Sequence, residues 1–162
     1  MSMLDMLRRT GGLSALSVRL DLTPTQSADI AGVFLPYLMG GFARAYRRSD
    51  DAAFVDRLQM LGGEAMAERV LIPGTIDPSQ GDEALKLAFG SNSIRDSVQA
   101  VLNKAVAIDG AVCREAMRLL ALLLGGYLIS QALRVELGIA GGIEPALREG
   151  LANDPLAAIV DA

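Results

Sequence analysis

Apolar residues recur at helical spacing along most of the chain. In the first long segment they fall on one helical face, at Ile30, Val33, Phe34, Tyr37, Leu38, Phe42 and Ala45. The Thr23-Pro24-Thr25-Gln26 stretch predicts the start of this helix, because Thr23 can cap free amides and Gln26 can reach back to the Thr23 amide. The pattern runs to about residues 47–49. Pro36 lies inside it and should kink the helix or divide it into two helices in series.

A second long segment begins at Asp109, a good N-cap residue. One face carries Val112, Ala116, Leu119, Leu120, Leu123 and Tyr127, and Leu122, Leu124 and Leu128 fill the other side. From Leu119 onward the segment is therefore apolar all round, which is typical of a helix enclosed by its neighbours. We expect it to be the central helix and to end or bend near Gly138.

Shorter helices fit the remainder of the chain, and no strand pattern of useful length is present. Ser49, Ser93, Asp109 and Asp154 supply candidate N-caps. The predicted short helices cover 2–10, 12–20, 50–61, 64–71, 79–89, 93–107, 143–152 and 155–161. The prediction is an all-α fold, a compact multi-helix bundle in a single domain over residues 1–162.

An internal similarity appears when the chain is slid by 85 positions, so that FLPYLMGGF (34–42) lies over LLALLLGGY (119–127). We interpret it as two related helical halves, roughly 1–71 and 81–162, joined by a linker at 72–80. Both copies contain a glycine pair, Gly40-Gly41 and Gly125-Gly126. Tight helix crossing explains such pairs better than backbone contact with a ligand, since neither forms a GxGxxG or P-loop motif.

Composition removes most catalytic chemistry. The chain has 162 residues, no histidine and one cysteine, Cys113. Imidazole catalysis, histidine-ligated metals and intramolecular disulfides are therefore excluded, and we predict no cofactor, no metal and no enzyme activity. Without a base beside it, Cys113 is interpreted as a small buried apolar residue and not as a nucleophile.

Charge is unevenly distributed. The net charge is -4, yet residues 1–48 hold six Arg and three Asp, a balance of +3, which leaves -7 for the remainder. The sign disfavours non-specific nucleic-acid binding. Arg44, Arg47 and Arg48 share one helical face and form a candidate contact site for an anion or a partner; the alternative is that they simply complement the helix dipole.

Two groups of acidic residues are candidates for a divalent ion or for acid–base catalysis. One is Asp77, Asp82 and Glu83, and the other is Asp50, Asp51 and Asp56. Neither has the spacing of an EF-hand. Both surround predicted helix starts, where acidic side chains are favoured by the helix dipole, so capping is the simpler interpretation.

The chain shows no pattern that directs it to a membrane. Its first residues carry an acid and no basic start before an apolar run, unlike a secretory signal. The longest uncharged stretches, Ile30 to Ala43 and Leu119 to Leu133, are shorter than the ~20 residues that span a bilayer. We predict a cytoplasmic protein without a transmembrane segment, with peripheral membrane contact as an open alternative.

The stretch GDEALKLAFGS (81–91), followed by a short amphipathic helix and the long LLALLLGGY helix, resembles the YidB-like bacterial proteins of uncharacterised function. The shared features are Gly81-Asp82, Leu85 and Phe89-Gly90. The resemblance implies an all-helical fold with a homeodomain-like arrangement and no established activity. Leu87 stands where family members often have a histidine, so no role of that histidine is implied here.

These observations leave three hypotheses. The leading one is a non-enzymatic helical module for self-association or for a protein partner, using an apolar helix face such as that of residues 24–47 or 119–133. The alternative is nucleic-acid binding through the basic N-terminal half. The third is a small-ligand or hydrolytic enzyme that uses Asp77, Asp82 and Glu83.

Overall fold

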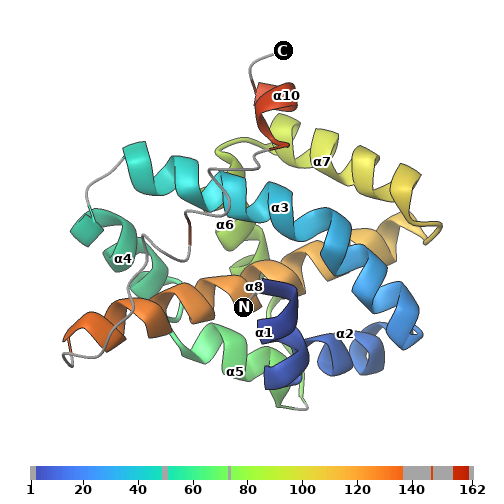
Figure 1. Cartoon of the computed structure of the whole chain (residues 1–162), viewed down its shortest axis with the longest axis horizontal. Coiled ribbons are helices and arrows are strands. Elements are labelled where there is room, and N and C mark those ends of the chain that lie inside the picture. Colours follow the sequence, from blue (N-terminus) through green and yellow to red (C-terminus); the bar gives the residue numbers. More distant parts are fainter. Residues whose placement is uncertain (1–2, 49–50, 73, 137–146, 148–154, 161–162) are drawn as a thin grey trace.

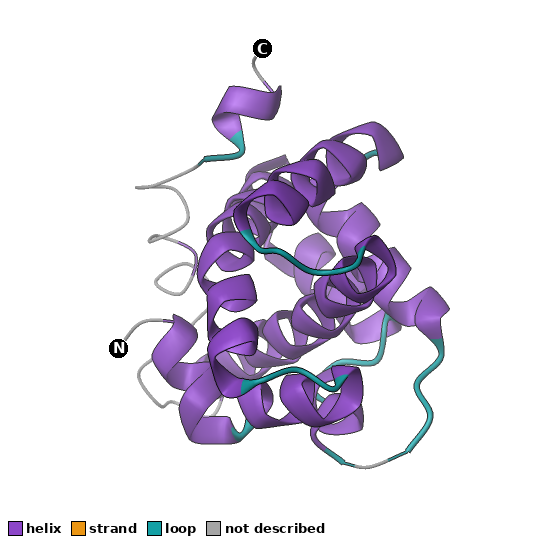
Figure 2. Ribbon diagram, turned by 90° about the vertical axis from the view of Figure 1, so that its right-hand side faces the viewer, coloured by secondary structure: helices purple, strands orange, loops and turns teal. Residues whose placement is uncertain are grey.

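The computed structural model describes residues 3–48, 51–72, 74–136, 147 and 155–160. These residues are mostly helical, and none of the described ranges forms a strand (Figure 2). The helices are α1 (Met3–Thr10), α2 (Gly12–Leu20), α3 (Pro24–Arg48), α4 (Asp51–Met60), α5 (Ala65–Leu71), α6 (Pro78–Phe89), α7 (Asn92–Ala105), α8 (Gly110–Glu136) and α10 (Ala157–Val160). The predicted all-α multi-helix fold is confirmed.

The two long helices, α3 and α8, cross at the centre of the molecule (Figure 1). Helix α8 packs against every helix from α2 to α7, and each side chain from Leu119 to Leu124 is at most 5% exposed. The prediction of a central, enclosed helix is therefore confirmed. Helix α3 contributes the other half of the core, with Ile30, Phe34, Leu38 and Phe42 all fully buried.

Among the described helices, only α8 is long and apolar enough to cross a membrane, over Gly110–Leu133. Within its most apolar window, 67% of the residues are buried inside the fold. A core helix satisfies the same criteria of length and composition, so the packing of α8 against its neighbours accounts for its apolar character.

The start of α3 has the predicted capping box. The Gln26 amide donates to Thr23 Oγ1 at 3.1 Å, and the Thr23 amide donates to Gln26 Oε1 at 2.9 Å. Pro36 lies inside one continuous helix, so the alternative of two helices in series is wrong. Pro36 removes the hydrogen bond to the Gly32 carbonyl, and because Gly32 is exposed, water can solvate that carbonyl.

Other helix boundaries differ slightly from the predictions. The N-cap of α7 is Ser91 and not Ser93, because Ser91 has extended backbone angles and its Oγ accepts from the Ile94 amide at 3.2 Å. Asp109 precedes α8 as predicted and accepts from the Ala111 amide. Helix α6 begins at Pro78, so the linker predicted at 72–80 gives its last three residues to α6. The predictions at Ser49, Asp154, Gly138 and most of 143–152 lie outside the described residues.

The glycine pairs mark close helix crossings, as predicted. A Cβ on Gly41 of α3 would lie 2.6 Å from the Ala88 carbonyl oxygen of α6. A Cβ on Gly126 of α8 would lie 2.6 Å from the Ala67 Cβ of α5. Neither position has room for a side chain, so each crossing requires glycine.

The two predicted halves interlock. Helix α3 of the first half packs closely on α6 of the second, and α8 of the second half packs closely on α5 of the first. Helix α2 contacts both α3 and α8, and α7 likewise contacts both α8 and α3. One continuous apolar core therefore joins the two halves.

Candidate functional site

The predicted arginine group lies in the last two turns of α3. Arg47 and Arg48 are exposed and Arg44 is half-buried. The Arg48 Nε donates to the Arg44 carbonyl at 3.3 Å, and one Arg48 Nη lies beside Gly90, the C-cap residue of α6. These cations therefore complement the C-terminal ends of two helices, where positive charge is favoured.

The apolar faces predicted to contact a partner are mostly buried inside the fold. Phe34 and Phe42 of α3 and Leu120 of α8 are completely buried within the chain itself. Most of the apolar face predicted on residues 24–47 and 119–133 therefore forms the core, although Leu123, Gly126 and Tyr127 of the second range line a surface groove. The helical period correctly identified an apolar face, but the two helices cover each other and are covered by the shorter helices.

Large apolar side chains remain exposed at other positions. They are Val18 (83% exposed), Met60 (86%), Ile72 (61%) and Leu71 (36%). Val18 belongs to α2, whereas Leu71 and Ile72 end α5. The ends of these two helices are held together by one side chain, Arg19.

Arg19 forms a clamp between α2 and the C-terminal end of α5 with the residues that follow it. Its Nε donates to the Val70 carbonyl at 2.9 Å, and one Nη donates to the Gly74 carbonyl at 2.8 Å. The other Nη donates to the carbonyls of Arg69 at 2.8 Å and Ile72 at 2.6 Å. A guanidinium fork thus satisfies carbonyls that a helix C-terminus leaves without intrahelical partners.

Three surface grooves adjoin these features. A groove of about 620 Å³ lies between α2 and the start of α3, with Val18 on its wall. A smaller pocket of about 180 Å³ lies beside the Arg19 clamp and is lined by Arg118, Glu115 and Asp77. A third, of about 250 Å³, lies between α1, α5 and α8. The first has one acid and one arginine on its walls and the second has two of each, whereas the walls of the third carry two glutamates and no basic residue.

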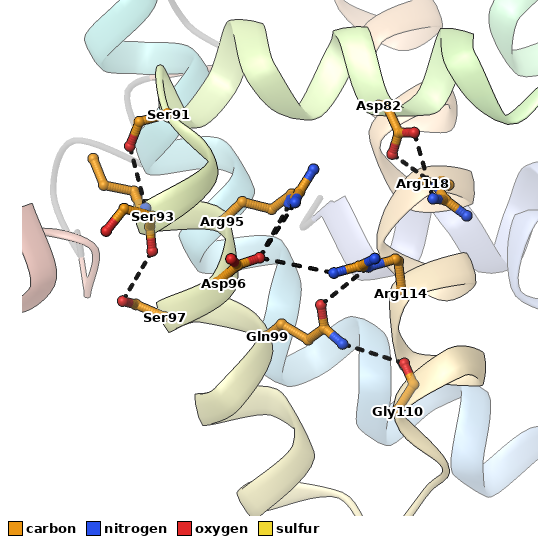
Figure 3. Close-up of polar contacts among 11 residues, drawn as sticks. Asp82, Ser91, Ser93, Arg95, Asp96, Ser97, Gln99, Gly110, Arg114 and Arg118 are labelled. Atoms are coloured by element: carbon orange, nitrogen blue, oxygen red, sulfur yellow. Dashed lines mark hydrogen bonds and ion pairs between the residues drawn. The ribbon is translucent and has the colours of Figure 1, made fainter.

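The acidic candidates on α6 have separate roles. Asp77 caps α6 by accepting from the Ser79 amide at 2.9 Å, and this hydrogen bond lowers the Asp77 pKa. Asp82 pairs with Arg118 of α8 at 2.8 Å (Figure 3), a hydrogen bond that raises the Arg118 pKa. Glu83 is exposed. In the other acidic group Asp56 is exposed, and Asp50 and the side chain of Asp51 lie outside the described part of the chain.

Helices α7 and α8 share a second polar network (Figure 3). Arg114 of α8 donates to Gln99 Oε1 at 3.4 Å and lies 3.8 Å from Asp96, while Gln99 donates to the Gly110 carbonyl at 3.2 Å. Each of these side chains is already engaged within the fold. The network therefore positions α7 on α8 and leaves no group obviously reserved for a ligand.

Cys113 is completely buried at the start of α8. Burial raises the pKa of its thiol to about 11, so the thiol is protonated at neutral pH and shielded from solvent. Among the described residues, no group of three or more acidic or cysteine side chains is arranged to hold a metal ion.

No protein-family model, no curated protein and no solved structure matches this chain. The resemblance to the YidB-like proteins therefore stays a prediction. The candidate sites stand on the geometry of this chain alone.

Proposed function

We propose that the protein is a non-enzymatic helical module that associates with itself or with a protein partner, through the surface that surrounds the Arg19 clamp. The observation that carries this proposal is the exposure of Val18 and Ile72 on the two segments that Arg19 joins. Burying a valine or isoleucine side chain is worth about 1.5 to 3 kcal/mol, so a partner that covered both would gain appreciable free energy.

The clamp supports the proposal because it orders the two segments that carry these side chains. Four hydrogen bonds from one guanidinium hold the end of α5 against α2. A surface that is already ordered loses little conformational entropy on binding. Isolated exposed apolar residues are common on proteins, so the test must separate this surface from such residues.

Light scattering after size-exclusion chromatography, at two protein concentrations, tests the proposal. We expect a species heavier than the 17.0 kDa monomer, whose mass changes little with salt because the contact is apolar. Val18→Glu and Ile72→Glu should shift it towards the monomer. Met60→Glu on α4 is the matched control, since Met60 is at least as exposed as Val18 and Ile72 but lies on a helix that is not part of the clamp.

If the pure protein is a monomer, the same variants should be compared in their binding to a partner isolated by cross-linking. A wild-type monomer that cross-links to no partner at this surface contradicts the proposal. Dissociation by Met60→Glu alone would also contradict it, because the interface would then lie on α4.

Nucleic-acid binding through the basic N-terminal half is a second candidate, favoured by the exposed Arg47 and Arg48 at the end of α3. A mobility-shift assay with duplex DNA at low salt tests it. Salt-sensitive binding that Arg44→Ala or Arg47→Ala weakens would support it, and the absence of any shift would eliminate it. Arg19 belongs to the clamp, so its charge is already shared with backbone carbonyls.

A further inference from the structure

The groove between α1, α5 and α8 differs from the rest of the surface in its chemistry. We name it the acidic groove. Its floor is apolar, formed by Met6, Ala67, Leu123 and Gly126, and Leu71 lies at one end. Its polar walls carry Glu64, Glu68, Tyr127, Ser130 and Thr10. Figure 1 labels the three helices that contribute lining residues to this groove, α1, α5 and α8.

The negative charge of the acidic groove is not balanced within the described part of the molecule. Glu64 and Glu68 stand four residues apart around α5, so they face the same side and repel each other. Neither carboxylate has a hydrogen-bond or ion-pair partner among the described residues. By contrast, Asp82 of α6 is paired with Arg118 of α8.

Helix capping does not explain the first of these acids. Glu64 occupies the N-cap position of α5 but makes no capping hydrogen bond, and glutamate is not a favoured N-cap residue. Glu64 is exposed and lines the acidic groove.

Two hydroxyl groups in the acidic groove are also free to bind. Tyr127 and Ser130 are partly buried, and among the described residues neither hydroxyl has a hydrogen-bond partner. Both come from α8, whereas the two glutamates come from the α5 segment. A hydrogen-bond donor seated between them would meet two carboxylates and two hydroxyl oxygens.

We propose that the acidic groove binds a basic, amphipathic segment of a partner protein, with one lysine or arginine side chain between Glu64 and Glu68 and an apolar neighbour on the floor. The groove volume of about 250 Å³ lies below the roughly 300 to 1,000 Å³ typical of small-molecule sites, and suits one or two side chains. A free polyamine would satisfy the carboxylates but leave the apolar floor uncovered. This inference rests on the proposed interaction function and adds the chemistry of the partner.

Fluorescence anisotropy with a labelled peptide of alternating leucine and lysine tests the proposal. We expect saturable binding that weakens with salt. Glu64→Gln with Glu68→Gln should lower the affinity by about tenfold, because two charge pairs are lost. Tyr127→Phe should lower it by about threefold, because one hydrogen bond is lost. The matched control is Asp56→Asn with Glu83→Gln, which changes the net charge equally at exposed positions outside the groove.

Three results would overturn the proposal that the acidic groove binds a basic, amphipathic segment. Absence of peptide binding up to millimolar concentration overturns the proposal. So does equal weakening by the groove and control variants, which would indicate attraction by net charge alone. Spermidine that competes at concentrations similar to those of the peptide would also overturn it, because the apolar floor would then contribute nothing.

The experiments distinguish failure of the acidic-groove proposal from failure of the proposed interaction function. Self-association that Val18→Glu abolishes and the glutamate variants leave intact would preserve the interaction function and remove the acidic groove from it. Peptide binding by a strictly monomeric protein would support the acidic groove and indicate that the partner is a different chain.

Discussion

Helices α3 and α8 occupy matching positions in the two predicted halves, yet only α8 is enclosed. With residue 34 placed over residue 119, Gly32 of α3 matches Met117 of α8. Gly32 is exposed with open space around it, whereas Met117 is 1% exposed. The same offset matches Pro36 to the fully buried Ala121. Helix α3 thus keeps a solvent-facing side, which is where an interrupting proline is tolerated.

The helices that precede them also differ. Arg19 at the end of α2 matches Lys104 at the end of α7, but Arg19 clamps α5 while Lys104 is exposed. Ser17 and Ser27, joined by a 2.7 Å hydrogen bond, match the apolar pair Leu102 and Val112. The glycine pairs common to both halves serve helix packing. Arg19 and the Ser17–Ser27 pair have apolar or exposed residues at the matching positions of the second half, and they hold the segments that form the proposed contact surface.

The shared glycines should give the largest effects. Gly41→Val and Gly126→Val force a side chain into a crossing without space, so each should lower the free energy of unfolding by about 3 kcal/mol. Urea denaturation measures this. Gly32→Val is the control and should change stability little, because nothing lies within 4 Å of its Cβ position. Similar stability of all three variants would show that the crossings are looser than described.

The second-largest loss of stability is expected at the Arg19 clamp. Arg19→Lys keeps the charge but cannot reach four carbonyls with a single ammonium group, so we expect a loss of about 1 to 2 kcal/mol. Hydrogen exchange should show faster opening at the end of α5. Lys104→Arg at the matching position should have no measurable effect, and an equal loss there would refute the asymmetry between the halves.

The serine pair should contribute less. Ser27 is completely buried, so Ser27→Ala leaves Ser17 without its partner and should cost about 1 kcal/mol. In a double-mutant cycle, Ser17→Ala combined with Ser27→Ala should cost less than the sum of the single changes. Additive losses would mean that the hydrogen bond does not couple the two residues.

The smallest expected effect is an increase in stability. Gly32→Ala adds a methyl group at an open helical position. Because alanine has a higher helix propensity than glycine, the free energy of unfolding should rise by about 0.5 to 1 kcal/mol. Met117→Ala at the matching position should instead destabilise, since it empties a buried site. Opposite signs at matched positions would confirm that only α8 is enclosed on this side.

Local signals in the sequence were sufficient to locate the helices. The capping box at Thr23 and Gln26, the N-cap at Asp109 and the glycine pairs act within a few residues or through the helix period, so they are readable from the chain alone. The buried, unreactive environment of Cys113 also follows the expectation from an apolar helix without a neighbouring base.

The candidate sites, by contrast, depend on tertiary contacts that local sequence signals do not reveal. The sequence predicts contact faces on the two long helices, whereas the large apolar residues that are exposed in the described part of the chain lie on or beside shorter helices: Val18, Met60, Leu71 and Ile72. No sequence signal distinguished Arg19 from the other arginines, because its carbonyl partners are about 50 residues away along the chain. The sequence pattern predicts a helix over 64–71 and does not single out Glu64, because the groove that Glu64 lines exists only where α5 packs beside α1 and α8.

The sequence by itself determined the all-α class, the positions of most helices, the residues of the core and the absence of imidazole chemistry. Only the tertiary structure decided which apolar residues stay exposed, which cations are neutralised and where the grooves lie. The physical reason is that helix formation depends on neighbours within one or two turns, whereas exposure and charge pairing depend on which distant segments pack together.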